Sequence, residues 1–369
     1  MNDRVLLLSV TPDPGFGAEK VLASLLDALP EDFAGRCILL RPPGSSLARW
    51  AVGDRADYCD WPARRDAAVF NLLACFPVAR ALRAERIGLV HAWGARAFES
   101  AVLLGRLLGA PVSGTVHDHP HASFHSGLRK VIIRRSAPRL KRLVCVSHAV
   151  AEACRDSGLN ADYSVIRNGL LPASPRSDSR RGGPVRVGFF GLYARPKGFE
   201  TVRHWIEATS PAIEWHLYGE PAPVLRDACE TLQAKGLSNI LFHGWVDSPQ
   251  IMDGIDILLH ASTEFDSYPT VLLEAARAGI PAVASNLGGS GEIIDDGVTG
   301  FLFSPSDPGA GLRCLRVLTA DPALRTRMGA AARCRFESEF GISRMIDSYL
   351  ALWDALLRDS TTAALGKRP

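Results

Sequence analysis

The amino-acid sequence predicts an α/β protein built from two doubly wound parallel-sheet domains. Apolar runs of strand length alternate with segments of helical periodicity, which indicates parallel strands covered by helices on both faces. This alternation breaks once, over residues 171–184, where proline, serine, arginine and glycine crowd together. The length of 369 residues also suits two domains of about 100–200 residues better than one.

The first domain is expected to begin with a buried strand. Strands are expected at residues 4–10, 37–43, 88–93, 111–119, 142–147 and 163–170, and helices at 18–30, 76–87, 96–109 and 148–158. The apolar run at the N-terminus is short and stops at a loop rich in proline and glycine. It therefore lacks the central apolar region and cleavage site of a signal peptide.

The second domain repeats this pattern after the break. Strands are expected at residues 185–193, 213–220, 239–245, 256–262, 280–286 and 299–305, and a final helix at 342–359. We therefore divide the chain into a first domain (1–172), a linker (173–184), a second domain (185–340) and a C-terminal helix and tail (341–369). The apolar face of the final helix suits either domain, and packing on the first domain is one alternative.

The composition excludes several classes of protein. Hydrophobic residues make up 47% and charged residues 22% of the chain, as in globular proteins, and the net charge of +3 is too small to indicate nucleic-acid binding. The eight cysteines form no Cys-x-x-Cys pair, so we expect reduced thiols and no metal. No run approaches the roughly 18 apolar residues of a membrane span. We expect a cytoplasmic protein, with peripheral contact on the inner face of the membrane as an alternative.

Two turns between a strand and a helix have the composition of phosphate-binding loops. Gly15 and Gly17 precede a helix whose first N–H groups would suit an anion. In the second domain, Lys197 and Gly198 precede a helix, and a lysine there can pair with a phosphate. The first turn is no dinucleotide fingerprint, because Lys20 stands where the third glycine would be. A tight turn and a solvated surface lysine are the alternative interpretations.

A short helix with an acid on each side of its start is the most informative segment. Pro269 suits the first turn of a helix and Gly279 suits its end, which predicts a helix over residues 269–278. The helix dipole alone would favour an acid at Asp266. Glu274 has apolar neighbours that predict burial, and a buried glutamate needs partners such as two sugar hydroxyls.

A glycine-rich loop follows the next expected strand. Gly288, Gly289 and Gly291 allow the backbone of this loop to bring N–H groups close to a phosphate. Each feature alone indicates little. A glycine loop, an acidic helix and a second glycine loop within one domain are together more specific.

In this order, the segments resemble the retaining glycosyltransferases of family 4, whose GT-B fold has two Rossmann-like domains facing each other across a cleft. The likeness covers nearly the whole chain and is strongest over residues 187–303. Residues 191–198 look like the lysine–glycine loop of the family, and residues 266–303 resemble its E-x7-E motif with the trailing glycine loop. In the first domain, residues 15–25 are similar to the family's glycine loop and residues 115–119 to its cleft histidine segment.

The resemblance implies transfer of a hexose-type sugar from a UDP- or GDP-sugar to a glycan or lipid-linked acceptor, in bacterial cell-surface polysaccharide synthesis. It further implies retention at the anomeric carbon, with no metal or other cofactor. Lys197 would contact the diphosphate, Glu274 the ribose hydroxyls and Asp266 the region of the donor sugar. His117 would line the cleft near the reacting sugar. The other donor-binding residues implied are Gly15, Gly17, Arg195, Gly288 and Gly289.

Two positions depart from the family pattern. The first motif acid is Asp266 instead of glutamate, shorter by one C–C bond of about 1.5 Å, so the loop must come closer or a water must bridge. The arginine that commonly follows the glycine of the lysine loop is replaced by Leu192, and Arg195 is the candidate substitute. Without a substitute, the diphosphate loses a charge-assisted contact worth ~1.5–3 kcal/mol.

The segment that starts at Gly127 and ends at Arg142 contains seven arginines and lysines and no acid. Aliphatic residues interleave with these cations, which predicts contact with an anionic membrane; a solvated basic helix is the alternative. Just before it, residues 117–125 hold four of the ten histidines. We favour a histidine-lined acceptor pocket there over a metal site, with surface histidines as the other alternative.

Two other functions fit the same fold. A sugar-nucleotide 2-epimerase would need an acid-rich cleft for proton abstraction, and the match to the lysine loop argues against it. A catalytically weak sugar-nucleotide-binding protein is consistent with Leu192 and Asp266. The sequence leaves the donor sugar, its base and the acceptor open.

Overall fold

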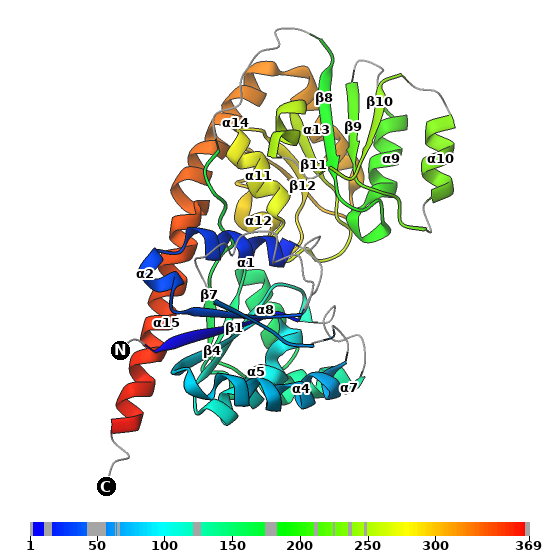
Figure 1. Ribbon diagram of the computed structural model, residues 1–369. Coiled ribbons are helices and arrows are strands. Elements are labelled where there is room, and N and C mark those ends of the chain that lie inside the picture. Colours follow the sequence, from blue (N-terminus) through cyan, green and yellow to red (C-terminus); the bar gives the residue numbers. More distant parts are fainter. Residues whose placement is uncertain are drawn as a thin grey trace. The chain divides into compact units, whose positions relative to one another are not determined.

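The computed structural model describes residues 3–10, 17–42, 57–62, 64, 67–120, 127–173, 183–209, 213–223, 226–234, 238–246 and 249–365. The chain divides into two compact units. Unit 1 comprises Met1–Leu171 with Ile342–Pro369, and unit 2 comprises Pro172–Gly341. Each unit is built around one parallel sheet with helices packed against it (Figure 1). This confirms the α/β class and the two doubly wound sheets predicted from the sequence.

Unit 1 has a seven-stranded sheet in the order β3-β2-β1-β4-β5-β6-β7. Its strands are β1 (Arg4–Leu8), β2 (Cys37–Arg41), β3 (Asp57–Asp60), β4 (Ile87–Trp93), β5 (Val112–Val116), β6 (Arg142–Cys145) and β7 (Tyr163–Val165). Five of them lie within the runs expected from the sequence, and β4 begins one residue before its expected run. The sequence pattern missed β3, an edge strand that pairs only with β2 and whose residues Asp-Tyr-Cys-Asp lack a buried strand's apolar run.

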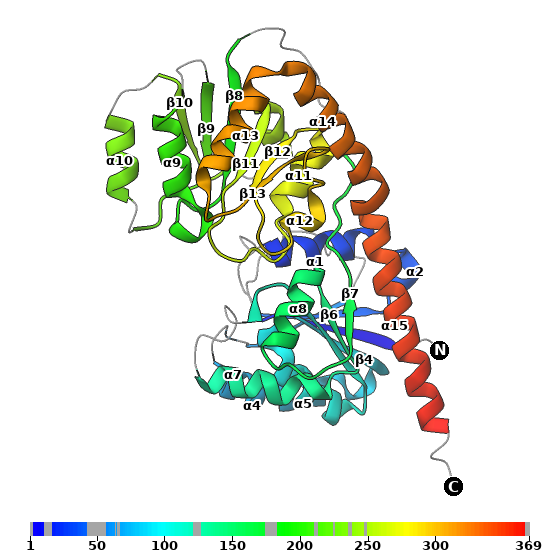
Figure 2. The ribbon, with the colours of Figure 1, turned by 180° about the vertical axis from the view of Figure 1, so that it is seen from behind.

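Helices cover both faces of this sheet. They are α1 (Gly17–Ala28), α2 (Glu31–Ala34), α4 (Ala68–Ala81), α5 (Phe98–Leu108), α7 (Gly127–Ser136), α8 (His148–Asp156) and α15 (Ile342–Leu365), with short 3₁₀ turns η1 (Leu82–Ala84), η2 (Ala95–Ala97) and η3 (Ala137–Arg139). Helices α4, α5 and α7 form one layer (Figures 1 and 2). Helices α1 and α15 contact each other on the opposite face. Pro77 lies inside α4, which starts eight residues before the expected helix.

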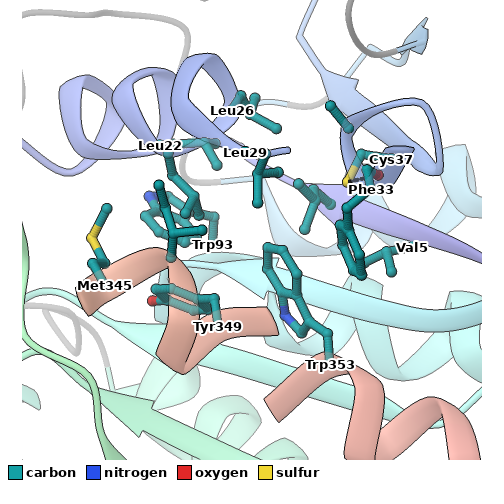
Figure 3. Packing of buried hydrophobic residues seen from close by; sticks show 14 of the residues in the cluster. Val5, Leu22, Leu26, Leu29, Phe33, Cys37, Trp93, Met345, Tyr349 and Trp353 are labelled. Carbon is teal, nitrogen blue, oxygen red and sulfur yellow. Dashed lines mark hydrogen bonds between the residues drawn. The ribbon is translucent and has the colours of Figure 1, made fainter. Parts of the chain in front are cut away.

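Helix α15 completes the core of unit 1 although it follows unit 2 in the chain. Met345, Tyr349 and Trp353 pack among residues of α1, β1, β2 and β4 (Figure 3). The indole of Trp353 stacks on Phe33, with the ring centroids 5.7 Å apart. The final helix therefore belongs to unit 1.

A buried histidine joins α15 to the sheet by hydrogen bonds. The His91 ring lies 2.7 Å from Ser113 Oγ and 3.0 Å from Thr115 Oγ1, and Thr115 Oγ1 lies 3.0 Å from the Tyr349 hydroxyl. Trp353 Nε1–H donates to His91 Nδ1 at 3.4 Å. Burial, with a smaller effect of His117, lowers the pKa of His91 to about 3, so the imidazole is neutral near pH 7.

Unit 2 has a six-stranded sheet in the order β10-β9-β8-β11-β12-β13. Its strands are β8 (Val185–Phe190), β9 (Ile213–Tyr218), β10 (Ile240–Gly244), β11 (Ile257–His260), β12 (Ala282–Ser285) and β13 (Gly300–Phe303). Its helices are α9 (Phe199–Glu207), α10 (Arg226–Ala234), α11 (Thr270–Ala278), α12 (Ser290–Ile293), α13 (Pro308–Ala320) and α14 (Pro322–Arg335), with 3₁₀ segments η4 (Arg195–Lys197) and η6 (Pro249–Gly254) and the π-helix η7 (Phe336–Phe340). All six strands fall where the sequence places them.

Replacing Trp353 with alanine should destabilise unit 1 by about 3–5 kcal/mol, because it leaves a cavity in the core and removes a donor from His91. Chemical denaturation followed by circular dichroism measures the change. Trp245→Ala, which truncates a 57% exposed indole of unit 2, is the matched control and should cost little. Equal stabilities of the two variants would contradict the assignment of α15 to the core.

Candidate functional site

The order of strands in unit 2 brings two loops together at one edge of the sheet. From β8, the chain adds β9 and β10 on one side and then β11, β12 and β13 on the other. The loops that follow β8 and β11 therefore leave the carboxyl ends of neighbouring strands. Such a reversal of strand order is where open parallel sheets bind ligands. The first loop contains Lys197 and the second contains Asp266.

Lys197 and Asp266 form an ion pair across these two loops. Lys197 Nζ lies 2.6 Å from Asp266 Oδ2, and the lysine side chain is 44% exposed whereas the aspartate is 15% exposed. Thr263 ties the loops together, because its N–H donates to Pro196 O at 3.0 Å and its hydroxyl to Arg195 O at 2.7 Å. The ammonium thus stays partly open to solvent while its partner is largely buried.

Gly198 allows the lysine turn to approach the second loop. Its φ of 74° lies in the left-handed region, and an added Cβ would lie 1.7 Å from the carbonyl oxygen of Ala261. No residue with a side chain fits there without moving the backbone. The glycine after Lys197, which the sequence suggested as part of a phosphate loop, has this structural role.

His260 is a neighbour of Asp266 that the sequence analysis did not select. It is the last residue of β11, it is buried, and its Nε2 lies 3.4 Å from Asp266 Oδ2 and 3.3 Å from Ser262 Oγ. Burial lowers the pKa of His260 to about 4, with Lys197 adding to this effect and Asp266 opposing it. The signal in the sequence was a histidine at the end of an otherwise apolar strand.

The electrostatics keep Asp266 ionised. Burial by itself raises the pKa of the carboxyl group. His260 and Lys197, together with hydrogen bonds from Lys197 and Ser262, outweigh burial and hold the pKa of Asp266 below its usual value. The site therefore contains a largely buried carboxylate beside a partly exposed ammonium.

Glu274 lies in α11, which the sequence predicted closely. The helix begins at Thr270, after Pro269 as the N-cap, and ends at Gly279 with a φ of 70°. The start is one residue later than expected. Glu274 is partly buried rather than fully buried, between the buried pairs Leu272–Leu273 and Ala275–Ala276.

Gly288 and Gly289 pack against the backbone of the Asp266 loop. An added Cβ on Gly288, whose φ is 55°, would lie 1.9 Å from Asp266 O, and one on Gly289 would lie 2.4 Å from Ser267 O. The N–H of Gly289 donates to Asp266 O at 2.9 Å. The sequence suggested that this N–H binds a phosphate. In the structure it is instead bonded within the protein and is not open to a phosphate. The close approach of the two loops explains the glycines.

Leu192, where the family commonly has arginine, and Arg195, its candidate substitute, are both at the surface. Leu192 is 49% exposed, and Arg195 is exposed at the start of η4, the same turn that carries Lys197. Among the described residues, no ion pair holds the Arg195 guanidinium. The structure thus brings Lys197, Arg195 and Asp266 to one place, and Gly288 and Gly289 pack against the backbone of the Asp266 loop.

In unit 1, His117 follows β5 and contacts the aromatic ring that ends β4. The ring centroids of Trp93 and His117 lie 4.6 Å apart, and Trp93 Nε1–H donates to Ala18 O in the first turn of α1 at 2.8 Å. Both ring nitrogens of His117 are buried and make no hydrogen bond to the residues that the structure describes. Burial lowers the pKa of His117 to about 3. A buried polar group of this kind calls for a water or a ligand.

Other predicted positions in unit 1 are less informative. Gly17 is the first residue of α1, whereas Gly15 lies outside the described residues. His119 is partly buried, and His121 and His125 lie outside the described residues. Within the described ranges, no cluster of three or more histidine, cysteine, aspartate or glutamate side chains has the geometry of a metal site.

Comparison with known families matches the two halves of the chain in turn. Residues 17–172 match a model described as Glycosyltransferase Family 4, and residues 184–321 match one described as Glycosyl transferases group 1. A curated relative is the lipopolysaccharide core biosynthesis glycosyltransferase LpsE of Rhizobium meliloti. It is 25% identical over 91% of this chain and 95% of its own length.

Solved structures share the fold over nearly the whole chain. HepE of Anabaena in complex with UDP has a TM-score of 0.82 at 20% identity, over 95% of this chain and all of HepE (100%). Sucrose-phosphate synthase of Thermosynechococcus elongatus has a TM-score of 0.78 at 17% identity, over 97% of this chain and 100% of its own. With the two parallel sheets, this likeness confirms the GT-B fold.

Replacing Lys197 with methionine should raise the pKa of the Asp266 carboxyl, because burial remains while the nearest cation is lost. The ionised Asp266 contributes to folding stability at pH values above the ordinary carboxyl pKa. This contribution is lost as the pH falls through the lowered pKa of the folded state. The variant should lose part of this stability. Carbon-13 NMR titration of the aspartate carboxyls measures the pKa. Lys141→Met, which removes an exposed cation of unit 1, should leave it unchanged, and an equally unaffected titration in Lys197→Met would refute the pairing.

Proposed function

We propose that this chain transfers a hexose-type sugar from a UDP- or GDP-sugar with retention at the anomeric carbon. Its two halves match these two models, so the chain belongs to the group 1 glycosyltransferases of family 4. The acceptor in this proposal is a glycan or lipid-linked glycan of a bacterial cell surface. The HepE structures contain UDP and UDP-glucose, and LpsE acts in lipopolysaccharide core synthesis, which supports both parts of the proposal. The observation that carries it is the Lys197–Asp266 pair at the reversal of strand order in unit 2.

Lys197 is the proposed ligand of the donor diphosphate. An ammonium group has three N–H donors, and the Asp266 contact uses one of them. The 44% exposure of the side chain leaves the others accessible to a phosphate. Arg195, exposed in the same turn, is the second proposed cation and takes the place of the arginine missing at Leu192.

Glu274 is the proposed ligand of the ribose hydroxyls. One carboxylate accepts hydrogen bonds from two neighbouring hydroxyls, because it has four lone-pair sites. Its place within the first two turns of α11 sets it close along the chain to the Asp266 loop. Gly288 and Gly289 then act on the donor indirectly, since they fix the backbone that presents Asp266.

The chemistry asked of these groups is electrostatic. As the bond from the anomeric carbon to the diphosphate breaks, negative charge grows on the leaving phosphate, and preorganised cations stabilise it without reorientation. Lys197 and Arg195 are these cations, and the acceptor hydroxyl attacks from the same face of the sugar while its proton passes to an oxygen of the departing phosphate. Asp266 holds Lys197 in place before the donor arrives and contacts the donor sugar, while His260 and Ser262 position its carboxylate. His117 is the proposed ligand of the sugar, because its ring nitrogens have no hydrogen-bond partner among the described residues.

A panel assay tests this activity. The full chain, incubated with UDP- and GDP-hexoses and a lipid-linked glycan acceptor, should release nucleoside diphosphate only when the acceptor is present. Asp266→Asn and Lys197→Met should reduce kcat, and Glu337→Ala, at an exposed position of unit 2, should not. Conversion of a donor into its 2-epimer without an acceptor would replace the proposal with an epimerase. Nucleotide binding without turnover of any donor would replace it with a binding protein.

Glu274→Ala should weaken the binding of the preferred nucleoside diphosphate about 100-fold. Two hydrogen bonds to a charged group, at ~1.5–3 kcal/mol each, are lost, and water recovers part of that energy. Isothermal titration calorimetry measures the affinity, with Glu337→Ala as the matched control. An affinity equal to that of the wild type would remove Glu274 from the donor site.

A further inference from the structure

Helix α4 is apolar all round but packs on only one side. Of its fourteen residues, Asn71 and Arg80 alone are polar. Ala74, Cys75 and Val78 are buried, and the Cys75 thiol contacts Ser100 O of α5. A helix with no polar face is normally covered on all sides. Its other side therefore requires an explanation.

The uncovered side of α4 is a stripe of large apolar residues. Val69, Leu73 and Phe76 are 68%, 63% and 54% exposed. Their spacing of four and three residues places them on one face of the helix, and exposed Arg80 continues the same line. Phe70, at the edge of the stripe, is 38% exposed. A contiguous apolar surface of this kind marks a binding site for a protein or a membrane.

Helix α7 adds apolar residues and cations to this surface. Leu128 and Val131 are 68% and 43% exposed, and Arg134 and Arg135 are exposed beside them. Ile133 points into the core on the opposite side. The outer side of α7 is therefore both apolar and basic.

The exposed charged side chains of the layer formed by α4, α5 and α7 are all positive. Helix α5 contacts both of the other helices, and the three lie together in both views (Figures 1 and 2). The exposed cations of this layer and of the turn that follows it are Arg80, Arg106, Arg134, Arg135, Arg139 and Lys141. Among these three helices the acid present is Glu99, which is buried and paired with Arg129. Every charge that this layer presents to solvent is positive.

A depression at the edge of the layer collects three of these cations. It has a volume of about 340 Å³ and is lined by Arg106, Arg139 and Lys141 together with Val102, Pro111 and Val112. Among the described residues that line it, none is acidic. It combines apolar walls with a positive rim, which suits a phosphate attached to an apolar group.

We propose that the outer face of α4, α5 and α7 is a docking surface for an anionic lipid bilayer. The stripe of Val69, Leu73 and Phe76 enters the boundary between headgroups and acyl chains, and the arginines and lysines pair with lipid phosphates, one of them in the depression. Within the described residues, no helix is long and apolar enough to cross a membrane, so this contact is interfacial. A two-fold contact between copies of the chain is disfavoured, because it would bring the same positive charges together.

This inference adds α4 to the basic segment noted in the sequence and does not depend on the residues of unit 2. Binding of the full chain to vesicles of phosphatidylcholine with 30% phosphatidylglycerol, measured by co-sedimentation, tests it. Leu73→Gln with Phe76→Gln should weaken binding about tenfold or more. Arg134→Gln with Arg135→Gln should weaken it about fivefold per cation at low salt and reduce its salt dependence. Val298→Gln with Val317→Gln, at residues of unit 2 that are 51% and 48% exposed, is the matched control.

The expected pattern is binding to anionic but not neutral vesicles, lost in the α4 and α7 variants and kept in the control. Unchanged vesicle binding in the α4 variant would overturn the proposal. The proposal would also be overturned if the wild type did not bind vesicles but self-associated, and the α4 variant abolished that self-association. This result would identify a second copy of the chain as the occupant of the surface. Nucleoside diphosphate affinity should be the same in all variants, which separates failure at this surface from failure of the proposed transferase function.

Discussion

The ion pair between Lys197 and Asp266 is the interaction around which unit 2 is arranged. It joins loops that leave neighbouring strands but lie 69 residues apart in the chain. A largely buried carboxylate is costly without partners, and here a cation, an imidazole and a hydroxyl supply them. Glycines let three backbone segments meet around this carboxylate. The candidate donor site is thus the place where the sheet's topology, the loop backbones and the charge all converge.

Unit 1 also has a buried polar side chain that needs partners, but this side chain, His91, is neutral. His91 is completely buried, and hydroxyls of β5 and the indole of α15 satisfy its ring nitrogens. Trp93 on the same strand then connects α15, α1 and His117 through ring contacts and one hydrogen bond. The polar centre of unit 1 therefore fixes its last helix, whereas that of unit 2 remains partly open. This contrast fits a structural role for the first and ligand binding for the second.

The sequence predicted the features that depend on residues close together in the chain. Buried parallel strands are apolar runs, so twelve of the thirteen strands were found, and Pro269 and Gly279 marked α11 almost to the residue. It did not predict that Lys197 contacts Asp266 or that His260 joins them, since those distances depend on strand order. It assigned the Gly289 N–H to a phosphate because a glycine's backbone freedom is visible in a sequence but its hydrogen-bond partner is not. The exposed side of α4 was likewise hidden, because an apolar helix looks the same in sequence whether it is covered or not.

The placement of α15 in unit 1 has a consequence for synthesis on the ribosome. Domains generally fold in the order in which they emerge, the N-terminal one first. Here the core of unit 1 lacks Tyr349 and Trp353 until all of unit 2 has been translated. The apolar faces of α1 and β4 lack these core partners during that interval, and unit 2 is the first unit whose residues have all been synthesised. The unit that begins the chain is therefore the second of the two whose core residues are complete.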